Sequence, residues 1–285
     1  MFAEMRVSAP AKINLNLKVL PKRADGFHVI ESIFQTVRLF DDLLICIEDG
    51  KNTCTVECYD MELPEQNTLS AAYKAFCLHT GFDRSVRVRL TKRIPSGGGL
   101  GGGSSDAAYF IKALSQLANV RLSSELSNKI AGEVGSDVFF FLCCAHPGCA
   151  LVTGRGEIVK PIKPRQDIHI LLVFPGVHSS TGEAYSLVDK AASEGEFADC
   201  PSFEELETVY NGPIVNWTFA NSFTPVIARR YPEIGAAIAE VRKAGAVFSD
   251  MSGSGSAVFG IFASAGEADI AFHALISKGL KCVAA

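Results

Sequence analysis

The chain has 285 residues and a mass of 30.5 kDa, a length that predicts about two domains, each with its own core. Hydrophobic residues make up 48% and charged residues 20% of the sequence, a balance that excludes a disordered chain. The net charge of −4 and the isoelectric point near 5.9 exclude the broad positive field that attracts nucleic acids or anionic membranes. One local excess needs a separate explanation, because six of the 25 glycines lie between Gly97 and Gly103.

The N-terminal segment, the length of the apolar runs and the spacing of the cysteines together predict a cytoplasmic protein. Glu4, Arg6 and Lys12 interrupt the N-terminal segment, so it does not resemble a signal peptide. The longest apolar run, Val138–Ala145, is shorter than the roughly 18 residues that span a bilayer. Nine cysteines without regular spacing are typical of reduced, buried thiols rather than of a disulfide framework.

One cysteine-rich cluster could in principle hold a soft metal, but its spacing favours core and turn positions. It has no Cys-x-x-Cys pair and no second half-site. Its members, within seven residues, are Cys143, Cys144, His146 and Cys149.

The first part of the chain reads mainly as strands. Residues 6–9 and 13–20 predict two of them, and the second alternates apolar with polar side chains. Residues 43–48 and 53–59 flank the turn residues 49–52, which predicts an antiparallel hairpin. Residues 86–90 predict a strand that buries Val86, Val88 and Leu90 and exposes Arg87 and Arg89. Helices are expected at 69–78, 105–117 and 123–131.

Turn and proline signals at Gly154–Lys163 predict a crossing between domains, placed at residues 1–157 and 158–285. The second part mixes strands and helices without strict alternation, so both halves read as α+β. Strands are predicted at 168–174, 246–249, 257–262 and the C-terminus, and helices at 180–192, 203–210, 223–230, 232–243 and 266–278.

The glycine segment joins a basic strand to a helix that begins near Ser104 and Ser105. Backbone without β-carbons can approach an anion closely, and a helix N-terminus adds N–H donors and positive partial charge. The segment therefore has the chemistry of a phosphate cradle.

Three alternatives for this segment fit less well. Gly97-x-Gly99-x-x-Gly102 satisfies the dinucleotide fingerprint, but a second helix follows where that fold needs a strand ending in an acid. No Gly-Lys-Ser/Thr follows the glycines, which excludes a Walker P-loop. A flexible linker would not be held between a strand and a capped amphipathic helix.

Phosphate transfer further requires a carboxylate to activate a hydroxyl and a cation to offset developing charge. Asp137, before an apolar run, and Lys12, at the entry to a strand, are candidates. A helix-capping aspartate and an exposed lysine are the commoner explanations for such residues, so residue chemistry alone identifies neither.

Three segments together resemble the GHMP kinase superfamily. They are residues 8–15, residues 95–108 and residues 251–259. A narrower similarity, to the branch whose substrate carries a cytidine diphosphate, rests on residues 12–15, 23–28, 135–138 and 175–177 with Thr181 and Tyr185.

The resemblance implies a two-domain α+β fold with the active site in the cleft between the domains. It implies ATP-dependent phosphorylation of the 2-hydroxyl of a cytidylyl-activated methylerythritol, with Asp137 as general base and Lys12 as the charge-stabilising cation. A nearby lysine would also favour the ionised carboxylate. The expected partners are small molecules, with neither nucleic acid nor membrane.

The resemblance also implies the binding residues. His28 would hydrogen-bond the cytosine between the rings of Phe27 and Tyr185, and Asn14 and Thr181 would place other polar groups of the substrate. Backbone N–H groups around Gly253 and Ser254 would close over its phosphates. The implied ATP-binding residues are Asn67, Leu69, Lys92, Pro95, Gly97, Gly98, Gly99, Leu100, Gly101, Gly102, Gly103, Ser104 and Ser105.

The sequence departs from the family pattern in three places. Phe27 stands where tyrosine is common, Phe139 where proline is frequent, and Ser222 where an aspartate is common. The last departure puts a role for an acid there in doubt. Mg²⁺ is expected with ATP, and the sequence assigns it no protein ligand; Asp106 is equally well explained by the helix dipole.

Two kinds of alternative remain open. Another GHMP kinase would act on mevalonate, homoserine or a sugar, none of which has a base for Phe27 and His28 to hold. A non-catalytic nucleotide-binding homologue would keep the glycines without turnover, and the presence of both Lys12 and Asp137 argues against it.

Overall fold

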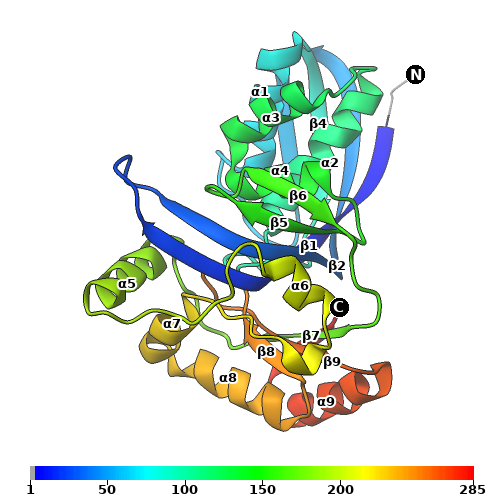
Figure 1. Cartoon of the computed structure of the whole chain (residues 1–285). Helices are drawn as coiled ribbons and strands as arrows, with labels where there is room; N and C mark the ends of the chain where they lie inside the picture. Colours follow the sequence, from blue (N-terminus) through cyan, green and yellow to red (C-terminus); the bar gives the residue numbers. More distant parts are fainter. Residues whose placement is uncertain (1–3) are drawn as a thin grey trace. The chain divides into compact units, whose positions relative to one another are not determined.

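The computed structural model describes residues 4–285 (Figure 1). The chain divides into two compact units. Strands β1 (Glu4–Lys22) and β2 (His28–Lys51) and the glycine segment each contribute to both units. The first unit holds residues 4–11, Leu39–Pro95 and Gly101–Ala145, and the second holds Lys12–Arg38, Ser96–Leu100 and His146–Ala285.

The sheet of the first unit corrects one prediction. Strand β4 (Arg84–Thr91) pairs antiparallel with β2, and β3 (Cys54–Cys58) pairs parallel with β4. The predicted antiparallel hairpin of residues 43–48 and 53–59 is therefore wrong, because β4 takes the place beside β2 that the hairpin required. The predicted alternation in β4 is confirmed, with its valines and Leu90 buried and Arg87 and Arg89 exposed.

Helices of the first unit form a packed group in which α1 contacts α2 and α3, and α4 contacts α2 and α3. Ser123 caps α3 as predicted, since its hydroxyl accepts a hydrogen bond from the Leu126 amide. Helix α2 begins at Gly102, three residues before the predicted start, because Gly101 in the left-handed region already serves as its N-cap. The bounds are α1 (Thr68–Thr80), α2 (Gly102–Leu117), α3 (Ser124–Val134) and α4 (Ser136–Cys143).

The second unit contains a four-stranded antiparallel sheet in the order β10-β7-β9-β8. Helices α8 and α9 pack on it (Figure 1). The predicted strands and helices of this part are confirmed to within a few residues. The bounds are β7 (His169–Phe174), β8 (Phe248–Met251), β9 (Val258–Phe262), β10 (Lys281–Ala284), α8 (Pro232–Lys243) and α9 (Ala265–Ser277).

The second unit also holds the N-terminal half of β2, which pairs antiparallel with β5 (Cys149–Thr153). Strand β6 (Ile158–Ile162) pairs with β5, so Gly154–Lys163 forms a hairpin turn and a strand. All nine cysteines are free thiols, but only Cys144 and Cys149 are buried and Cys143 is exposed, so the predicted burial holds for two of them. No helix among residues 4–285 is long and apolar enough to cross a membrane. The remaining helices are α5 (Thr181–Ser193), α6 (Leu206–Asn211), a short 3₁₀ turn (Ile214–Asn216) and α7 (Thr224–Arg230).

Candidate active site

In the first unit, the C-terminal half of the glycine segment forms the start of α2. Gly101 has φ +69° and the next residues, from Gly102 to Ser105, make the first helical turn. The Ser105 amide already donates to Gly101 O at 2.9 Å, whereas the amides of Gly102, Gly103 and Ser104 have no intrahelical acceptor and can face an anion. A β-carbon on Gly102 would lie 2.9 Å from Ile94 Cγ2, and one on Gly103 would lie 3.3 Å from Thr68 Oγ1. Glycine at these two positions therefore permits close packing of the turn.

Lys92 contacts α2 through Asp106 and forms a buried cluster of charged side chains with Asp106 and Asp41. Its Nζ donates to Asp41 Oδ2 at 2.5 Å and to Asp106 Oδ2 at 3.0 Å. Asp41 Oδ1 also accepts from the Arg93 and Ile94 amides. Burial opposes the charge of Lys92, but Asp106 and Asp41 outweigh it and raise the pKa of the lysine. The Lys92 ammonium, expected to line the ATP site, is thus committed to two carboxylates.

Two other residues expected at the ATP site shape the start of α1. Asn67 Oδ1 accepts from the Leu69 and Ser70 amides at 3.0 Å, and Ser70 Oγ accepts from the Asn67 amide. This reciprocal pair is a capping box. Leu69 as a whole is 1% exposed and belongs to the core, and its amide is committed to Asn67 Oδ1. Pro95 is half-buried just before the glycine segment.

Asp137 lies in the first turn of α4, where a negative charge is favoured by the helix dipole. Its side chain is half-buried, while Val138 and Phe140 anchor the helix in the core. The carboxylate thus sits at a defined helix end that is accessible to solvent. The N-cap of α4 is Gly135 and, in the described chain, no side chain caps this helix, so the capping explanation does not hold for Asp137.

In the second unit, the N-terminal half of the glycine segment packs backbone to backbone against residues 252–257. The Ala257 amide donates to Gly98 O at 3.2 Å, and Ser252 Oγ donates to Gly99 O at 2.9 Å. A β-carbon on Gly99, which has φ +72°, would lie 2.0 Å from Ser252 O. Only glycine fits this position, so close backbone approach explains part of the glycine excess.

Lys12 and Asn14 form a buried polar pair beside this segment. Lys12 is 3% exposed, and its Nζ donates to Asn14 Oδ1 at 2.6 Å and lies 4.5 Å from the centre of the Phe34 ring. The Lys12 amide donates to Leu100 O at 2.9 Å. Asn14 Nδ2 in turn donates to Ser32 Oγ at 3.2 Å. Backbone and side-chain contacts therefore fix the ammonium beside the glycine segment.

Asn221 holds the Ser-Gly segment, residues 252–256, in place. Its Nδ2 donates to Met251 O at 2.7 Å and to Gly253 O at 2.8 Å. Next in this segment, Ser254 Oγ lies 3.0 Å from Thr181 Oγ1. Gly253, Ser254 and Thr181, all expected to touch substrate, are therefore neighbours. Ser222, which replaces an aspartate, accepts a hydrogen bond from the Val19 amide.

Of the three residues expected to hold the cytosine, His28 and Tyr185 lie in contact and Phe27 does not join them. His28 and Tyr185 stack with ring centres 5.0 Å apart and planes inclined by 23°. Phe27 is 47% exposed, and the guanidinium carbon of Arg155 lies 3.7 Å from the centre of its ring. Tyr185 also meets Phe223 edge to face, with ring centres 5.0 Å apart, and His28 is buried. The structure therefore brings His28 and Tyr185 together and places Phe27 in a separate stack with Arg155.

Comparison with known proteins adds independent information. The GHMP kinases N terminal domain matches residues 67–145, and the GHMP kinases C terminal domain matches residues 205–281. The chain is 40% identical over 285 residues to a 4-diphosphocytidyl-2-C-methyl-D-erythritol kinase of Treponema pallidum (strain Nichols), covering 98% of this chain and 97% of the relative. It is 38% identical over 256 residues to a kinase of the same name from Thermotoga maritima, covering 88% and 90% of the two chains. The chain belongs to the GHMP kinase family.

Solved structures agree with this assignment. A crystal structure of 4-(cytidine 5'-diphospho)-2C-methyl-D-erythritol kinase superposes with a TM-score of 0.79 at 31% identity, covering 98% of each chain. Homoserine kinase from Cytophaga hutchinsonii gives 0.68 at 18% identity, over 99% of this chain and 93% of that one, which shows the shared fold alone. The predicted α+β GHMP fold is confirmed, and the protein is an enzyme, a kinase.

Three polar residues of the kinase were missed by the sequence reasoning. Asp41 holds Lys92, Ser32 holds Asn14, and Asp189 lies 3.1 Å from His28 Nε2. Asp41 and Ser32 come from β2, whose first half was not predicted. Asp189 follows Tyr185 by four residues, and that helical spacing places both on one face of α5. Only Asp189 therefore had a sequence signal that could have revealed it.

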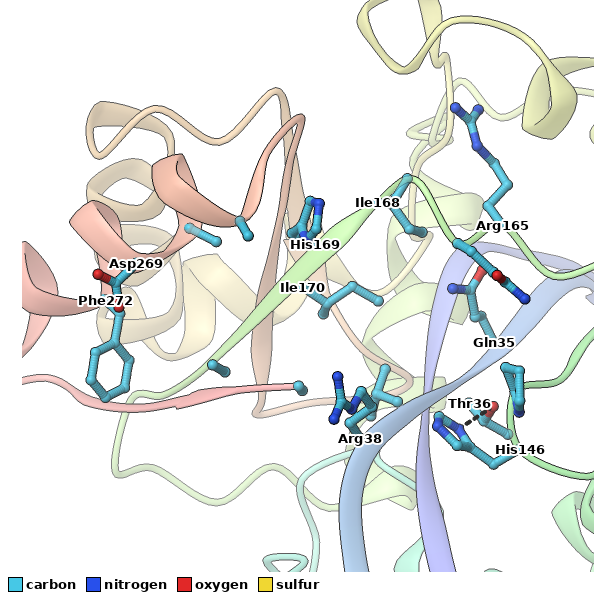
Figure 2. A pocket seen from close by; sticks show the side chains of 17 residues that line it. Gln35, Thr36, Arg38, His146, Arg165, Ile168, His169, Ile170, Asp269 and Phe272 are labelled. Atoms are coloured by element: carbon cyan, nitrogen blue, oxygen red, sulfur yellow. Dashed lines mark hydrogen bonds between the residues drawn. The ribbon is translucent and has the colours of Figure 1, made fainter.

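The second unit contains a cavity of about 850 Å³ away from the residues discussed above (Figure 2). Its lining comes from β2, β7, α9 and the segments around His146 and Arg165, and it includes none of the expected site residues. His146, from the cysteine-rich cluster, pairs there with Thr36 Oγ1 at 2.9 Å. Among residues 4–285, no three His, Cys, Asp or Glu side chains are grouped to hold a metal.

Proposed function

We propose that this kinase transfers the γ-phosphoryl group of ATP to the 2-hydroxyl of 4-diphosphocytidyl-2-C-methyl-D-erythritol, in the non-mevalonate route to isoprenoid precursors. The observation that carries the proposal is the His28–Tyr185 stack, a flat aromatic subsite in the unit that also holds Lys12. Mevalonate, homoserine and simple sugars have no base to use such a subsite. Relatives and a solved structure that bear this substrate in their names support the same choice.

In this reaction Asp137 accepts the proton of the substrate hydroxyl as its oxygen attacks the γ-phosphorus, and ADP leaves in line. A positioned general base contributes roughly 10²–10⁴-fold to such a step. Lys12 offsets the negative charge that develops on the transferred group. The bond to Asn14 Oδ1 supports this role, because it restricts where the ammonium can point.

The glycine segment binds the phosphates of ATP through backbone N–H groups. Support comes from the Gly102, Gly103 and Ser104 amides, which have no intrahelical acceptor at the start of α2, and from the close backbone packing of Gly99 against Ser252. Asn67 and the core residue Leu69 would lie beside the nucleoside, while Lys92 would hold α2 through its bond to Asp106.

Mg²⁺ is expected with ATP, and the chain offers oxygen atoms that suit it. Ser105 Oγ and Asp106 Oδ1 are buried without a hydrogen-bond partner in the described chain, and a hydroxyl with one carboxylate oxygen is a common protein contribution to a Mg²⁺ site. These two residues would hold the ion, which supplies charge neutralisation to the phosphates when bound.

On the substrate side, Tyr185 and Phe27 would enclose the cytosine and His28 would meet its edge. Asn14, Thr181 and the segment around Gly253 and Ser254 would hold the remaining polar groups. The bond between Asn14 and Ser32 and the contact between Thr181 and Ser254 support these roles by fixing the donors.

Two further expectations belong to this proposal. The domains would divide at residues 157 and 158, a position between the matched N-terminal region, which ends at residue 145, and the C-terminal one, which begins at residue 205; the compact units differ from this division, because residues 146–157 pack in the second unit. The enzyme would act in the cytoplasm on free small molecules.

An ATP-consumption assay tests the proposal with the cytidylyl substrate, mevalonate, homoserine and a hexose side by side. We expect turnover with the cytidylyl substrate and rates at least a hundredfold lower with the others. Turnover of another substrate at an equal or higher kcat/KM would replace the proposed function, and no turnover of any would favour a non-catalytic homologue.

A further inference from the structure

His178, in the loop between β7 and α5, packs directly against the glycine segment. A β-carbon on Gly97, which has φ +70°, would lie 2.4 Å from His178 Cε1 and 2.6 Å from His178 Nδ1. The imidazole therefore fills the space that a side chain at position 97 would occupy. Both residues belong to the second unit. The contact, together with the positive φ, favours glycine at position 97.

The Ser-Gly segment holds the backbone on both sides of His178. On one side, Ser256 Oγ donates a hydrogen bond to Val177 O. On the other side, Ser179 is 3% exposed, and its Cβ would lie 3.4 Å from a β-carbon on Gly255. The loop is therefore anchored at the two residues that flank the histidine, and this anchoring limits where its ring can reach.

The imidazole of His178 is available to a ligand. The residue is exposed, and among residues 4–285 neither of its ring nitrogens has a hydrogen-bond or ion-pair partner. His28 differs in this respect, since its Nδ1 lies 2.9 Å from Leu20 O. An imidazole carries at least one N–H in either charge state. His178 therefore offers a hydrogen-bond donor beside the glycine segment whether or not its ring is charged.

We propose that His178 is a phosphate-binding residue of the kinase, whose imidazole N–H donates to a phosphate oxygen of ATP beside Gly97. The position of the ring carries this assignment, because it touches the segment that would hold those phosphates. Backbone N–H groups of the segment would bind the same anion, and a placed side-chain donor would add to them. The inference rests on the proposed function, because it requires ATP at the glycine segment.

A purely structural role for His178 would need only a flat ring beside Gly97. His178→Phe keeps such a ring and removes the N–H donor. His178→Gln removes the ring and keeps an N–H donor of similar reach. The two variants therefore separate phosphate binding from packing.

The test measures calorimetric binding of a non-hydrolysable ATP analogue and the KM values for ATP and the cytidylyl substrate. We expect His178→Phe to raise the Kd of the analogue and the KM for ATP about tenfold or more, the factor that one hydrogen bond to a charged group supplies. The inhibition constant of adenosine, which has no phosphate, should stay unchanged, as should the KM for the cytidylyl substrate. His178→Gln should retain most of the affinity for the analogue.

His273→Phe is the matched control, since this exposed histidine lies on α9 and its Nε2 is 3.7 Å from Asp269. Its values should equal those of the wild type. An unchanged Kd in folded His178→Phe, or a rise confined to the KM for the cytidylyl substrate, would overturn the inference and leave the proposed function intact. A wild type that does not bind the ATP analogue would instead overturn the proposed function, and this inference with it.

Discussion

Residues 97–100 of the glycine segment and the ring pair of His28 and Tyr185 lie in the same unit of the kinase, yet they are built differently. The first is made of backbone, and a β-carbon on Gly99 would collide with Ser252 O at 2.0 Å. The second is made of side chains. The ring centres of His28 and Tyr185 lie 5.0 Å apart, and Asp189 Oδ1 lies 3.1 Å from His28 Nε2.

This contrast matches what each region is proposed to bind. Phosphates are small, repeated anions that backbone N–H groups recognise without side-chain selectivity. A pyrimidine has a flat face and a distinctive edge, which need a ring and a specific donor. We therefore expect substitutions in the glycine segment to affect packing and ATP together, and substitutions in the ring subsite to affect one substrate only.

The largest effect should come from Asp137, the proposed general base. Asp137→Ala should reduce phosphoryl transfer by at least about 10³-fold, because the general base is lost, while ATP binding persists. Single-turnover transfer and calorimetric titration with an ATP analogue measure the two. Glu133→Gln, an exposed acid on α3, is the control, and full transfer by Asp137→Ala would remove the assigned role.

The next effect tests the backbone-built region. Gly99→Ala should lower the free energy of unfolding by about 3 kcal/mol, through steric overlap added to a positive φ, and should raise the KM for ATP at least about tenfold. Thermal or urea denaturation and steady-state kinetics measure these changes.

Gly176→Ala is the matched control for Gly99→Ala. Gly176 also has a positive φ, +79°, but nothing lies within 4 Å of its added β-carbon. It should lose only about 1 kcal/mol, the conformational part, with normal ATP kinetics. Equal losses in the two variants would show that close packing does not determine the glycine at position 99.

A smaller and more selective effect tests the ring subsite. Phe27→Ala should raise the KM for the cytidylyl substrate about tenfold, since base stacking on an aromatic ring is worth about 1–3 kcal/mol. The KM for ATP should stay unchanged. Phe27→Tyr should behave as the wild type, because the stacking face is retained. A parallel rise in both KM values would contradict a separate base subsite.

The smallest effect is a pH dependence of the free energy of unfolding that comes from Asp250, on β8 just before the Ser-Gly segment. Burial raises the pKa of Asp250 to about 6, although Thr224 and the Met251 amide donate to its Oδ1. The folded protein then holds a proton that the unfolded chain releases, so wild-type stability should fall as pH rises from about 4 to about 6.

Asp250→Asn keeps an oxygen acceptor and removes the ionisation. Its free energy of unfolding should fall less over this pH range, by a difference of about 1–3 kcal/mol, in urea denaturation at several pH values. Identical pH profiles in the two proteins would show that Asp250 does not titrate in this range.

Local patterns predicted much of the fold. The buried face of β4, the Ser123 cap of α3 and the whole of α8 follow from periodicity and capping within a few residues of sequence. The partner of β3 did not follow, because parallel pairing with β4 depends on contacts distant in the chain. The first half of β2 was also missed, since it pairs with β5 more than a hundred residues later.

The site was predicted unevenly for the same reason. The motifs that carry the resemblance include Lys12, the glycines and His28, and so they could propose these residues for the site. Asp41 and Ser32 act through partners far along the chain, Lys92 and Asn14, which no local pattern reveals. Lys92 was expected beside the nucleoside, and its commitment to two acids appears only when β2, β4 and α2 are folded together.

The central claim is that the kinase recognises its substrate through the base. The most direct measurement compares ATP consumption with the cytidylyl substrate and with methylerythritol phosphate, which keeps the reacting hydroxyl but lacks the cytidylyl group. We predict turnover with the first and at least a hundredfold lower kcat/KM with the second. Equal kcat/KM values for the two would contradict recognition by the ring subsite.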